Sequence, residues 1–562
     1  MKRTLIPAIF MIALMLCSKA PAQWTEPVTA EKYMVASGHR LATEAGVKIL
    51  RKGGNAFDAA VAVSAALAVV EPYSSGLGGG GFWLLHIAKD HNDVMLDGRE
   101  RAPLAATRDM YLDEKGEVIA GASIDGPLSA GIPGTVAALE QLSKKYGSLP
   151  LSTTLAAAIR YARDGFAVDE HYIKMATHRQ NALQTSDAAE IFLRDDLVPR
   201  VGELITQPDL AETIKLIAEN GSKAFYAGDL AKKMVASVKE HGGIWSMEDL
   251  ASYKVVERSP EVIVYKGMRL VAASPPSSGG MALAEMLNML SFFNIEKMKS
   301  VDRIHILTEV MRRAYRDRAE YLGDPDFIDV PTDLLTSSVY TNKLVKSINR
   351  KKATPSSSLK PVADPTGKGT DTTHFSIIDA EGNRVSATMS INYPFGSGFV
   401  AEGTGVLLND EMDDFSSKPG AANVYGLVGA EANAIEPGKR MLSSMTPSFL
   451  ETKDRVAILG TPGGSRIITM VLLSMLDFYQ GGDAESMVNL GRFHHQYLPD
   501  KITFEPGVFN EVEVEALMAM GHQVEALSGS YGNMHAIVVD KATKKVEAAS
   551  DTRGIGRAIV LH

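Results

Sequence analysis

The stretch GKGTDTTHFS, residues 367–376, marks an abrupt change in the character of the chain. Residues 350–370 are charged, rich in Pro, Ser and Lys and without hydrophobic periodicity, which is typical of a flexible linker. The sequence THFSIIDAEGNRVSATMSIN that follows predicts two strands joined at residues 381–383. A linker therefore leads directly into a strand, and the chain divides near residue 371 into a helix-rich part and a part that opens with a sheet.

Three threonines at this junction raise the question of a nucleophile: Thr370, Thr372 and Thr373. A threonine hydroxyl is a poor nucleophile unless a base removes its proton, and in mid-chain that base is a neighbour such as histidine. If the peptide bond before a threonine is cut, the new α-amine, with a pKa of about 7.7–8.0, can serve as the base. The hydroxyl can make this cut by attacking the preceding carbonyl, after which the ester hydrolyses. The residues alone do not distinguish Thr372 from Thr373.

The first 22 residues have the pattern of a secretory signal peptide. A basic start precedes an apolar core at residues 5–16, and Ala-Pro-Ala at residues 20–22 forms a small-x-small cleavage site. The apolar core is too short to span a bilayer as a helix. A lipoprotein signal at Cys17 is the weaker interpretation, because Leu16 occupies the position where that signal needs a small residue. We therefore expect an exported protein, periplasmic or alternatively secreted.

Removal of residues 1–22 changes the composition in two ways. It takes away Cys17, the only cysteine, so the mature chain has neither a disulfide nor a thiol nucleophile. It also takes away three basic side chains and no acidic one, so the formal charge falls from −9 to −12. An acidic exported protein is a poor candidate for binding nucleic acid. No later stretch approaches membrane-spanning length, so we expect no stable membrane anchor.

Residues 55–70 are apolar almost all round and predict a buried helix, which a glycine-rich segment follows. A G-x-G-x-x-G motif at residues 76–81 formally matches the dinucleotide fingerprint, but it follows a helix and leads into a strand at residues 82–88. Phosphate cradles need the opposite order, so we expect close backbone approach beside a buried strand instead. Residues 151–350 predict mostly helices with charged, solvated faces.

Nine stretches then occur in one order along the chain: GGNAFDAAVAV, GLGGGGF, LDGRERAP, AYRDRAEYLGDP, DTTHFSIID, GVLLNDEMDDFS, KRMLSSMTPS, GTPGGSRIIT and RFHHQ. From about residue 30 to its end, the chain resembles the γ-glutamyltransferase (γ-glutamyl transpeptidase) family of N-terminal nucleophile hydrolases. The resemblance implies an α+β fold, a four-layer αββα sandwich. It also implies self-cleavage between Asp371 and Thr372, so that Thr372 is the nucleophile and opens a central strand.

The same resemblance implies two subunits that stay associated as a heterodimer. The large subunit would comprise residues 23–371, ending in the flexible segment 350–371, and the small subunit would comprise residues 372–562. It implies no cofactor and no metal.

A γ-glutamyl substrate carries a free α-carboxylate, a free α-amine and a scissile amide, and each needs a matching group. Arg99 suits the carboxylate because a guanidinium gives paired, charge-assisted hydrogen bonds. Without the resemblance, a surface salt bridge would be the simplest role for Arg99. Arg101 fits that role better. The resemblance adds the hydroxyls of Ser443 and Ser444, although two serines before Thr-Pro most often form a turn.

Glu411 and Asp414 offer carboxylates for the substrate ammonium, with help from the amide oxygen of Asn392. Such an acidic loop is otherwise solvated, or suggests calcium, but the D-x-[DN]-x-[DN]-G pattern is absent. His494 and His495 also suggest a metal. Adjacent residues on a strand point to opposite faces, however, and no carboxylate or cysteine at metal spacing accompanies them, so we expect a structural role.

Gly463 and Gly464 precede an apolar helix-like run, and free N–H groups at a helix N-terminus can hold an oxyanion. The motif could equally be a tight turn, or a phosphate site that lacks the Lys of a P-loop. Ser390 stands where the family usually has a threonine that hydrogen-bonds the nucleophile, and the lost methyl could loosen its rotamer. Tyr425 matches the aromatic residue of the family's lid loop, which implies a covered acyl pocket.

The resemblance implies transfer of the γ-glutamyl group of glutathione and other γ-glutamyl compounds to water, amino acids or dipeptides. Within the same fold, a glutaryl or cephalosporin acylase and a poly-γ-glutamate depolymerase are alternatives, although they need no site for a free α-amine. An exported amino-acid binding protein is an alternative of another class, and it would need no cleavage. The complete set of charged and hydroxyl residues favours the transferase.

Overall fold

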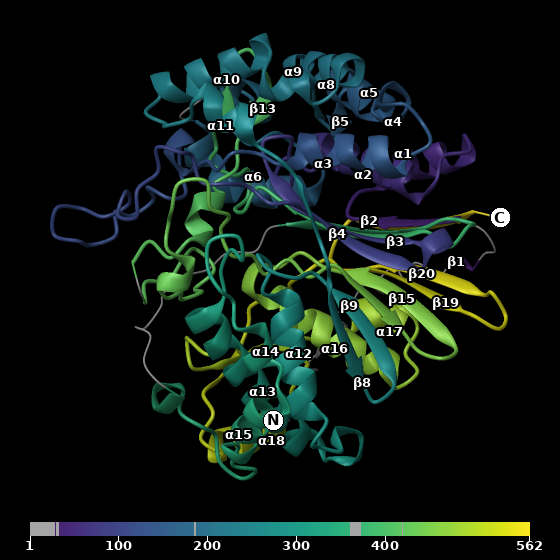
Figure 1. Ribbon diagram of the computed structural model, residues 1–562, viewed down its shortest axis with the longest axis vertical. Helices are drawn as coiled ribbons and strands as arrows, with labels where there is room; N and C mark the ends of the chain where they lie inside the picture. The colour runs from purple at the N-terminus through teal and green to yellow at the C-terminus, as the bar shows by residue number, and fades with distance from the viewer. Residues whose placement is uncertain (1–27, 30–32, 185–186, 360–371, 419, 562) are drawn as a thin grey trace, which may run out of the picture.

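The computed structural model describes residues 28–29, 33–184, 187–359, 372–418 and 420–561. Two sheets of seven strands each lie face to face, and helices cover the outer side of each (Figure 1). The first sheet has the order β21 (Arg557–Leu561), β2 (Tyr33–Ser37), β10 (Thr373–Ile378), β11 (Arg384–Ser390), β3 (Gly80–Ile87), β4 (Asn92–Gly98) and β7 (Val256–Arg258). The second has the order β1 (Val28–Thr29), β20 (Val546–Ser550), β19 (His535–Asp540), β15 (Arg455–Gly460), β14 (Ser448–Glu451), β9 (Met268–Ala272) and β8 (Glu261–Tyr265).

All strand pairs within these two sheets are antiparallel. Three small sheets lie outside them: β5 (Phe166–Ala167) with β6 (Leu204–Ile205), β12 (Val400–Ala401) with β13 (Val406–Leu407), and β16 (Phe493–His494) with β17 (Ile502–Phe504) and β18 (Val524–Ala526).

The helices form the two outer layers (Figure 1). On the side of the first sheet lie α1 (Arg40–Arg51), α2 (Ala56–Val70), α3 (Thr135–Gln141), α4 (Leu151–Thr154), α5 (Ala156–Asp164), α6 (Glu170–Leu183), α7 (Ala188–Phe192), α8 (Pro208–Asn220), α9 (Lys223–Tyr226), α10 (Asp229–Glu240) and α11 (Met247–Ser252). On the side of the second sheet lie α12 (Gly279–Leu290), α13 (Ser300–Tyr321), α14 (Thr332–Leu335), α15 (Ser338–Lys346), α16 (Ile467–Tyr479), α17 (Ala484–Asn489) and α18 (Glu511–Ala519). The expected αββα sandwich is thereby confirmed.

Strand β3 shows how the layers are held together. Phe82 and Leu84 belong to the core between the two sheets, whereas Trp83 and Leu85 belong to the core beneath the helices. The Trp83 indole N–H donates to the hydroxyl of Ser64 in α2 at 3.1 Å. Since successive strand residues point to opposite faces and both faces are buried, a continuous apolar run is what such a strand requires.

Helix α2 confirms the expected buried helix, since every one of its residues is buried. It begins with a capping box in which Asn55 and Asp58 satisfy each other's backbone N–H groups. The glycine-rich segment after it also behaves as expected. A Cβ atom on Gly78 would collide with the carbonyl oxygen of Leu407, so this position needs a residue without a side chain.

The expectation that residues 151–350 are mostly helical was incomplete, because this stretch also supplies five strands, β5 to β9. The edge strand β8 contains Val262 and Val264, which are 53% and 70% exposed, on either side of the buried Ile263. Buried and exposed residues alternate regularly along this strand. The exposed residues are apolar, however, so the sequence does not show the alternation of apolar and polar residues that is typical of a surface strand. The β-branched run EVIVY was the available signal.

The two parts of the chain on either side of residue 371 are interleaved. Strands β2, β3, β4 and β7 precede this position and β10, β11 and β21 follow it, yet all belong to the first sheet. The two strands expected after the junction are confirmed as β10 and β11, whose pairing begins with Thr373 opposite Met389. Thr372 therefore stands at the start of a central strand, between β2 and β11.

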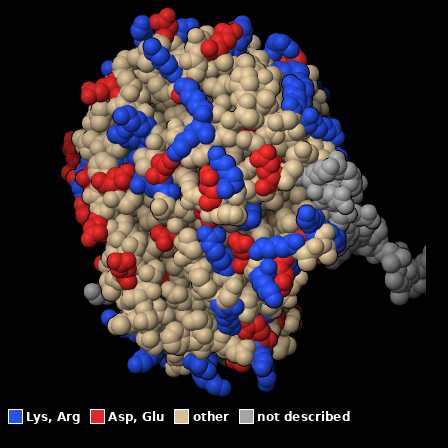
Figure 2. Space-filling view, turned by 45° about the vertical axis from the view of Figure 1, so that its right-hand side comes forward, with Lys and Arg blue, Asp and Glu red and all other residues tan. Residues whose placement is uncertain are grey.

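Among the described residues, no helix is both long and apolar enough to cross a membrane. The proposed signal peptide, residues 1–22, lies outside the described residues, and so does Asp371. On the face drawn in Figure 2, basic and acidic side chains are interspersed, and no broad field of one sign covers it.

Candidate active site

A small cavity lies at the start of β10, and ten of the residues expected from the sequence line it. They are Arg99, Thr372, Ser390, Asn392, Glu411, Asp414, Tyr425, Ser443, Ser444 and Gly464. Three apolar residues that the sequence did not indicate complete the lining: Leu427, Met445 and Ile467. The cavity thus brings together side chains from distant segments around one threonine hydroxyl.

The serine at position 390 is the strand neighbour of Thr372. The β10–β11 register pairs Thr373 with Met389, so one step further it sets Ser390 opposite Thr372. The Ser390 hydroxyl oxygen accepts a 2.8 Å hydrogen bond from the backbone N–H of Asn392. This contact gives the Ser390 hydroxyl a fixed backbone partner, and the effect of the missing methyl group stays a prediction.

Arg99 and two acidic residues form a buried ion cluster in this cavity. Arg99, just past the end of β4, donates to Glu411 and, at 2.5 Å, to Asp414. Arg99 and Glu411 are each 1% exposed. Burial raises the pKa of Glu411 to about 7 and also raises that of Asp414, while Arg99 acts against both shifts. Arg99 and two acids thus lie together in the cavity that Thr372 also lines, and a third buried acid, Glu100, lies 3.5 Å from the Arg99 guanidinium.

Arg101, by contrast, makes no ion pair with a carboxylate of the described residues, although the sequence suggested a salt bridge. It donates to the backbone carbonyls of Gly438, at 2.8 Å, and Ser252, at 3.3 Å. Sequence spacing does not reveal such carbonyl partners, because one lies at the end of α11 and the other in a loop more than three hundred positions away.

The two serines at 443 and 444 lie at the same cavity and are fixed by the second helical layer. Ser444 accepts a 3.1 Å hydrogen bond from Arg318 of α13, which also donates to Ser278 at 2.9 Å. The Ser443 hydroxyl oxygen accepts from the backbone N–H of Met445 at 3.1 Å. Arg318 is a residue that sequence reasoning missed, although it lies in the stretch AYRDRAEYLGDP.

Gly463 and Gly464 form the turn that enters α16 and both have positive φ values, 143° and 54°. Gly464 lines the cavity, and a Cβ atom on it would collide with the ring of Tyr425. Within the described part of the chain, neither backbone N–H of the pair has an acceptor. Two such N–H groups at the N-terminal end of a helix suit a developing negative charge.

Tyr425 covers one side of the cavity. Its hydroxyl donates to the backbone carbonyl of Asn392. The loop that carries it is tied to the acidic turn, because Val424 N–H donates to Asp413 at 2.8 Å and the Asn423 amide donates to Asp414 at 2.9 Å. Tyr425 itself thus contacts Asn392, and its two preceding neighbours tie its loop to Asp413 and Asp414.

Asn392 has its amide nitrogen engaged with Asp410, donating to the backbone carbonyl at 3.0 Å and to the carboxylate at 3.3 Å. The amide oxygen is then the atom left for another donor.

The adjacent histidines each have protein partners. His494 contacts Thr469 and Gln496, both at 2.8 Å. His495 contacts Asp500 at 3.2 Å and accepts from the backbone N–H of Tyr497. These contacts account for all four ring nitrogens without a metal.

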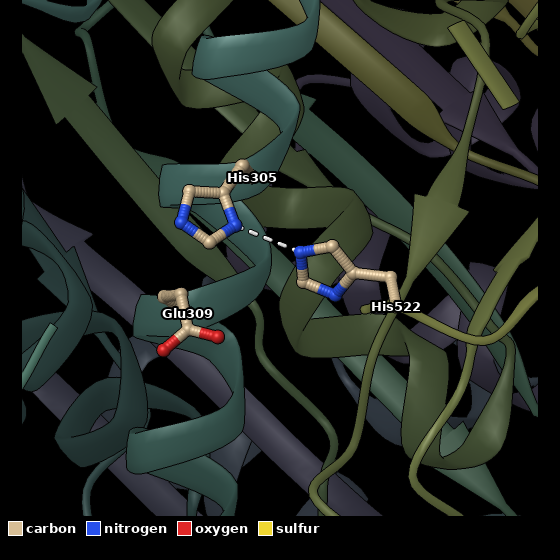
Figure 3. A group of neighbouring side chains, drawn as sticks. All are labelled: His305, Glu309 and His522. Atoms are coloured by element: carbon tan, nitrogen blue, oxygen red, sulfur yellow. Dashed lines mark hydrogen bonds between the residues drawn. The ribbon is translucent and has the colours of Figure 1, made fainter. Parts of the chain in front are cut away.

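Within the described residues, His305, Glu309 and His522 are close enough together to share a metal ion (Figure 3). Their contacts explain them otherwise. His305 and His522 lie 2.8 Å apart at their ring nitrogens and His305 also donates to the carbonyl of Asn349 at 2.7 Å, whereas Glu309 accepts from Arg313 at 2.6 Å. Nitrogens on one tetrahedral zinc ion would be about 3.3 Å apart. The His305–His522 hydrogen bond joins α13 to the loop after α18, and Glu309 pairs separately with Arg313.

An αββα sandwich with a threonine at the start of a central strand, beside paired backbone N–H groups, defines an N-terminal nucleophile hydrolase. The family model described as Gamma-glutamyltranspeptidase matches residues 42–561. The chain belongs to this family.

Individual relatives agree with this assignment. The Glutathione hydrolase proenzyme of Escherichia coli (strain K12) is 42% identical, over 94% of this chain and 92% of its own. The crystal structure of cephalosporin acylase from Bacillus halodurans is similar with a TM-score of 0.85 at 28% identity, covering 98% of this chain and 100% of that one. Helicobacter pylori gamma-Glutamyltranspeptidase gives a TM-score of 0.56 at 43% identity, covering 58% of this chain and 94% of that one. Membership makes this chain an enzyme of the gamma-glutamyltranspeptidase type.

Proposed function

We propose that this chain is an exported γ-glutamyltransferase and glutathione hydrolase in which Thr372 is the nucleophile. The observation that carries the proposal is the cluster of Arg99, Glu411 and Asp414 in the same cavity as Thr372 and Gly464. The cation matches the α-carboxylate of a γ-glutamyl amide, the two carboxylates match its α-ammonium, and the hydroxyl and the oxyanion site match its scissile amide.

Substrate recognition follows from the charges. The substrate α-carboxylate binds Arg99, with further hydrogen bonds from the hydroxyls of Ser443 and Ser444. The α-ammonium binds Glu411 and Asp414, and it favours their ionised forms, because an opposite charge counteracts the effect of burial. The free amide oxygen of Asn392 is a further acceptor for this ammonium.

Catalysis then proceeds by acyl transfer. The α-amine of Thr372 takes the proton of the Thr372 hydroxyl, which attacks the γ-carbonyl carbon. The N–H groups of Gly463 and Gly464 bind the oxyanion, the C–N bond breaks, and the leaving amine receives the proton. Water or another amine attacks the γ-glutamyl ester in the same way, releasing glutamate or a new γ-glutamyl amide and restoring Thr372. Ser390 holds the Thr372 hydroxyl in line for both attacks.

The α-amine must first be made by cleavage between Asp371 and Thr372. The Thr372 hydroxyl attacks the Asp371 carbonyl, and water hydrolyses the resulting ester to give subunits of residues 23–371 and 372–562. The interleaved strands support their association after the cut, since β10 remains paired with β2 of the other subunit and β11 with β3. Export rests on the signal-peptide pattern of residues 1–22, and we place the mature enzyme in the periplasm.

The test combines processing with activity. The purified wild-type protein should separate into two bands on a denaturing gel, and the smaller band should begin with Thr372 on N-terminal sequencing. Thr372→Ala should remain one chain without activity towards γ-glutamyl-p-nitroanilide, whereas Thr370→Ala should be cut and active. A Thr372→Ala protein that is cut and active would refute the proposal.

An acylase function is the second candidate, because the cephalosporin acylase structure covers the whole fold. A glutaryl substrate has no α-ammonium, so it offers no second cation to Glu411 and Asp414 beside Arg99. We therefore expect γ-glutamyl-p-nitroanilide to be cleaved far faster than glutaryl-p-nitroanilide. The reverse preference would assign the chain to the acylases.

A further inference from the structure

The core between the two sheets contains a polar layer close to Thr372. In β10 and β11 this layer consists of His374, Ser376, Ser386 and Thr388, and all four side chains are fully buried. The alternate residues of both strands face the other way, into the apolar core beneath the helices. Because a buried polar side chain costs stability unless it finds partners, the partners of this layer show what it holds in place.

Two serines of this layer form hydrogen bonds directly to the second sheet. Ser376 donates to the backbone carbonyl of His535 in β19 at 3.2 Å. Ser386 donates to the carbonyl of Leu459 in β15 at 3.0 Å and accepts from the backbone N–H of Ser448 in β14 at 3.0 Å. These bonds fix how the two sheets face each other near the site.

His374 is held from the side of the first sheet. Its Nδ1 atom lies 2.9 Å from the hydroxyl of Thr388, and its Nε2 atom lies 3.2 Å from the hydroxyl of Ser376. The ring lies parallel to that of His535, with 6.4 Å between the ring centroids. Burial lowers the pKa of His374 well below its usual range, so the ring is neutral near pH 7 and acts through its shape.

The ring of His374 reaches across to Gly460, the last residue of β15. A Cβ atom on Gly460 would collide with the Cε1 and Nδ1 atoms of this ring. The φ of Gly460 lies outside the left-handed region, so the backbone itself would accept alanine. Only the ring of His374 therefore requires a glycine at this position.

This contact between the sheets lies close to both parts of the proposed chemistry. Thr372 stands two residues before His374, and strand residues two apart point to the same face. On the other sheet, Gly463 and Gly464 follow Gly460 by three and four residues. Two residues of extended chain span at most about 7 Å and four at most about 14 Å. The first sheet thus carries the hydroxyl, the second sheet leads into the turn of the two glycines, and the ring stands between the sheets.

We infer that the His374 ring is a spacer between the two sheets, seated on Gly460. It sets the separation between the Thr372 hydroxyl and the N–H groups of Gly463 and Gly464. The inference rests on the proposed function, which gives this hydroxyl and these N–H groups their roles. His374 does not line the cavity at Thr372, so it is a positioning residue.

The spacer acts on rate and not on substrate binding. The groups proposed to bind the substrate charges, Arg99, Glu411 and Asp414, belong to other segments than β10 and β15. A change in the separation of the two strands therefore moves the attacking hydroxyl relative to the oxyanion donors. A misplacement of about 1 Å between reacting groups can cost a hundredfold in rate.

The test is a double-mutant cycle on the ring and its seat. Gly460→Ala places a methyl group against the ring and should lower kcat for γ-glutamyl-p-nitroanilide about 10- to 100-fold, with KM changed less than about twofold. His374→Asn has a shorter side chain, leaves room for that methyl group, and should itself lower kcat about three- to tenfold. In the His374→Asn protein, Gly460→Ala should then cost less than about threefold, because the two residues are coupled. Each kcat is counted per cleaved small subunit on a denaturing gel.

Gly46→Ala is the matched control for added bulk. Gly46 lies in α1, and a Cβ atom there would collide with Val63 in the core beneath the helices. This variant should lower the melting temperature and leave kcat unchanged. A fall in kcat as large as that of Gly460→Ala would mean that any added bulk in the core slows the enzyme, and it would refute the spacer.

The remaining outcomes separate the spacer from the proposed function. If the wild type is neither cut nor active, the proposed function fails. If the wild type is active but Gly460→Ala has a normal kcat, or the losses of the two variants simply multiply, the spacer is refuted and the proposed function stands. If Gly460→Ala stays uncut, the same cycle is measured on self-cleavage: the double variant should be cut, and a double variant that stays uncut refutes the spacer.

Discussion

Thr373 donates a 2.6 Å hydrogen bond from its hydroxyl to the carboxylate of Glu71, at the C-terminal end of α2. Glu71 is 3% exposed, and a Cβ atom on Gly38 would lie 2.8 Å from the Thr373 hydroxyl oxygen. Because Thr372 is the preceding residue, this tightly packed contact fixes the strand end on which the proposed nucleophile stands. No step of the chemistry requires Glu71, so we interpret it as a positioning residue.

The first prediction concerns this positioning. Glu71→Ala removes the acceptor, frees the end of β10 and should lower kcat about ten- to hundredfold with little change in KM, because misplacement of a reacting group costs rate and not binding. Glu71→Gln retains an acceptor oxygen and should recover most of the activity. An equal loss in both variants, or a loss confined to KM, would argue against positioning.

The second prediction concerns stability and pH. Burial raises the pKa of Glu71 to about 7, although the bond from Thr373 opposes the shift. The unfolded value is about 4.3, so the folded state binds a proton that the unfolded state releases between these pH values. This contribution to stability is complete below about pH 4.3 and is lost as the pH rises through 7, at a cost of about 4 kcal/mol.

Glu71→Gln is neutral at every pH and should escape this loss. Its free energy of unfolding relative to wild type should therefore improve by up to about 3 kcal/mol between pH 5 and pH 8. Denaturant titrations of both proteins at the two pH values measure the difference. A relative stability that stays constant with pH would contradict the raised pKa.

The third prediction concerns Arg99. Arg99→Lys retains the charge but loses the planar fork that contacts Glu411 and Asp414, so kcat/KM for γ-glutamyl-p-nitroanilide should fall about 10- to 100-fold. Arg101→Lys loses only contacts to backbone carbonyls and should remain within about threefold of wild type. Similar losses in both variants would mean that Arg99 acts through structure alone.

The fourth prediction concerns Ser390. Its hydroxyl is already held by the Asn392 N–H at 2.8 Å, so the methyl group added in Ser390→Thr should change kcat by less than about threefold. Ser390→Ala removes the hydroxyl and should lower kcat at least tenfold, in the range of about one lost hydrogen bond to a reacting group. A large gain in Ser390→Thr would show that the rotamer is loose after all.

The sequence predicted the residues that line the cavity better than the residues that hold them in place. The change from a linker to a strand at Thr372 and the family resemblance together predicted ten residues that line one cavity. Arg318 and Glu71 were missed, because the hydrogen bond that links each of them to a predicted residue or its neighbour spans more than a hundred positions of the chain. Spacing along a chain carries no information on such contacts. Strand β8 was missed for a different reason, since its exposed face is apolar and breaks the usual alternation.

The last prediction tests the turn of Gly463 and Gly464, which we propose as the oxyanion site. Gly464→Ala places a methyl group against the ring of Tyr425 and must shift the turn, which moves the N–H groups that we propose to hold the oxyanion. We expect kcat to fall about 10²- to 10³-fold, the usual loss of an oxyanion donor. Gly481→Ala, at the other end of α16, is the control for backbone strain: its φ of 107° is even less favourable for alanine than the 54° of Gly464, but a Cβ atom there has nothing within 4 Å. Gly481→Ala should lower the melting temperature and leave kcat unchanged. If Gly464→Ala loses only stability, then the N–H groups of this turn do not stabilise the transition state.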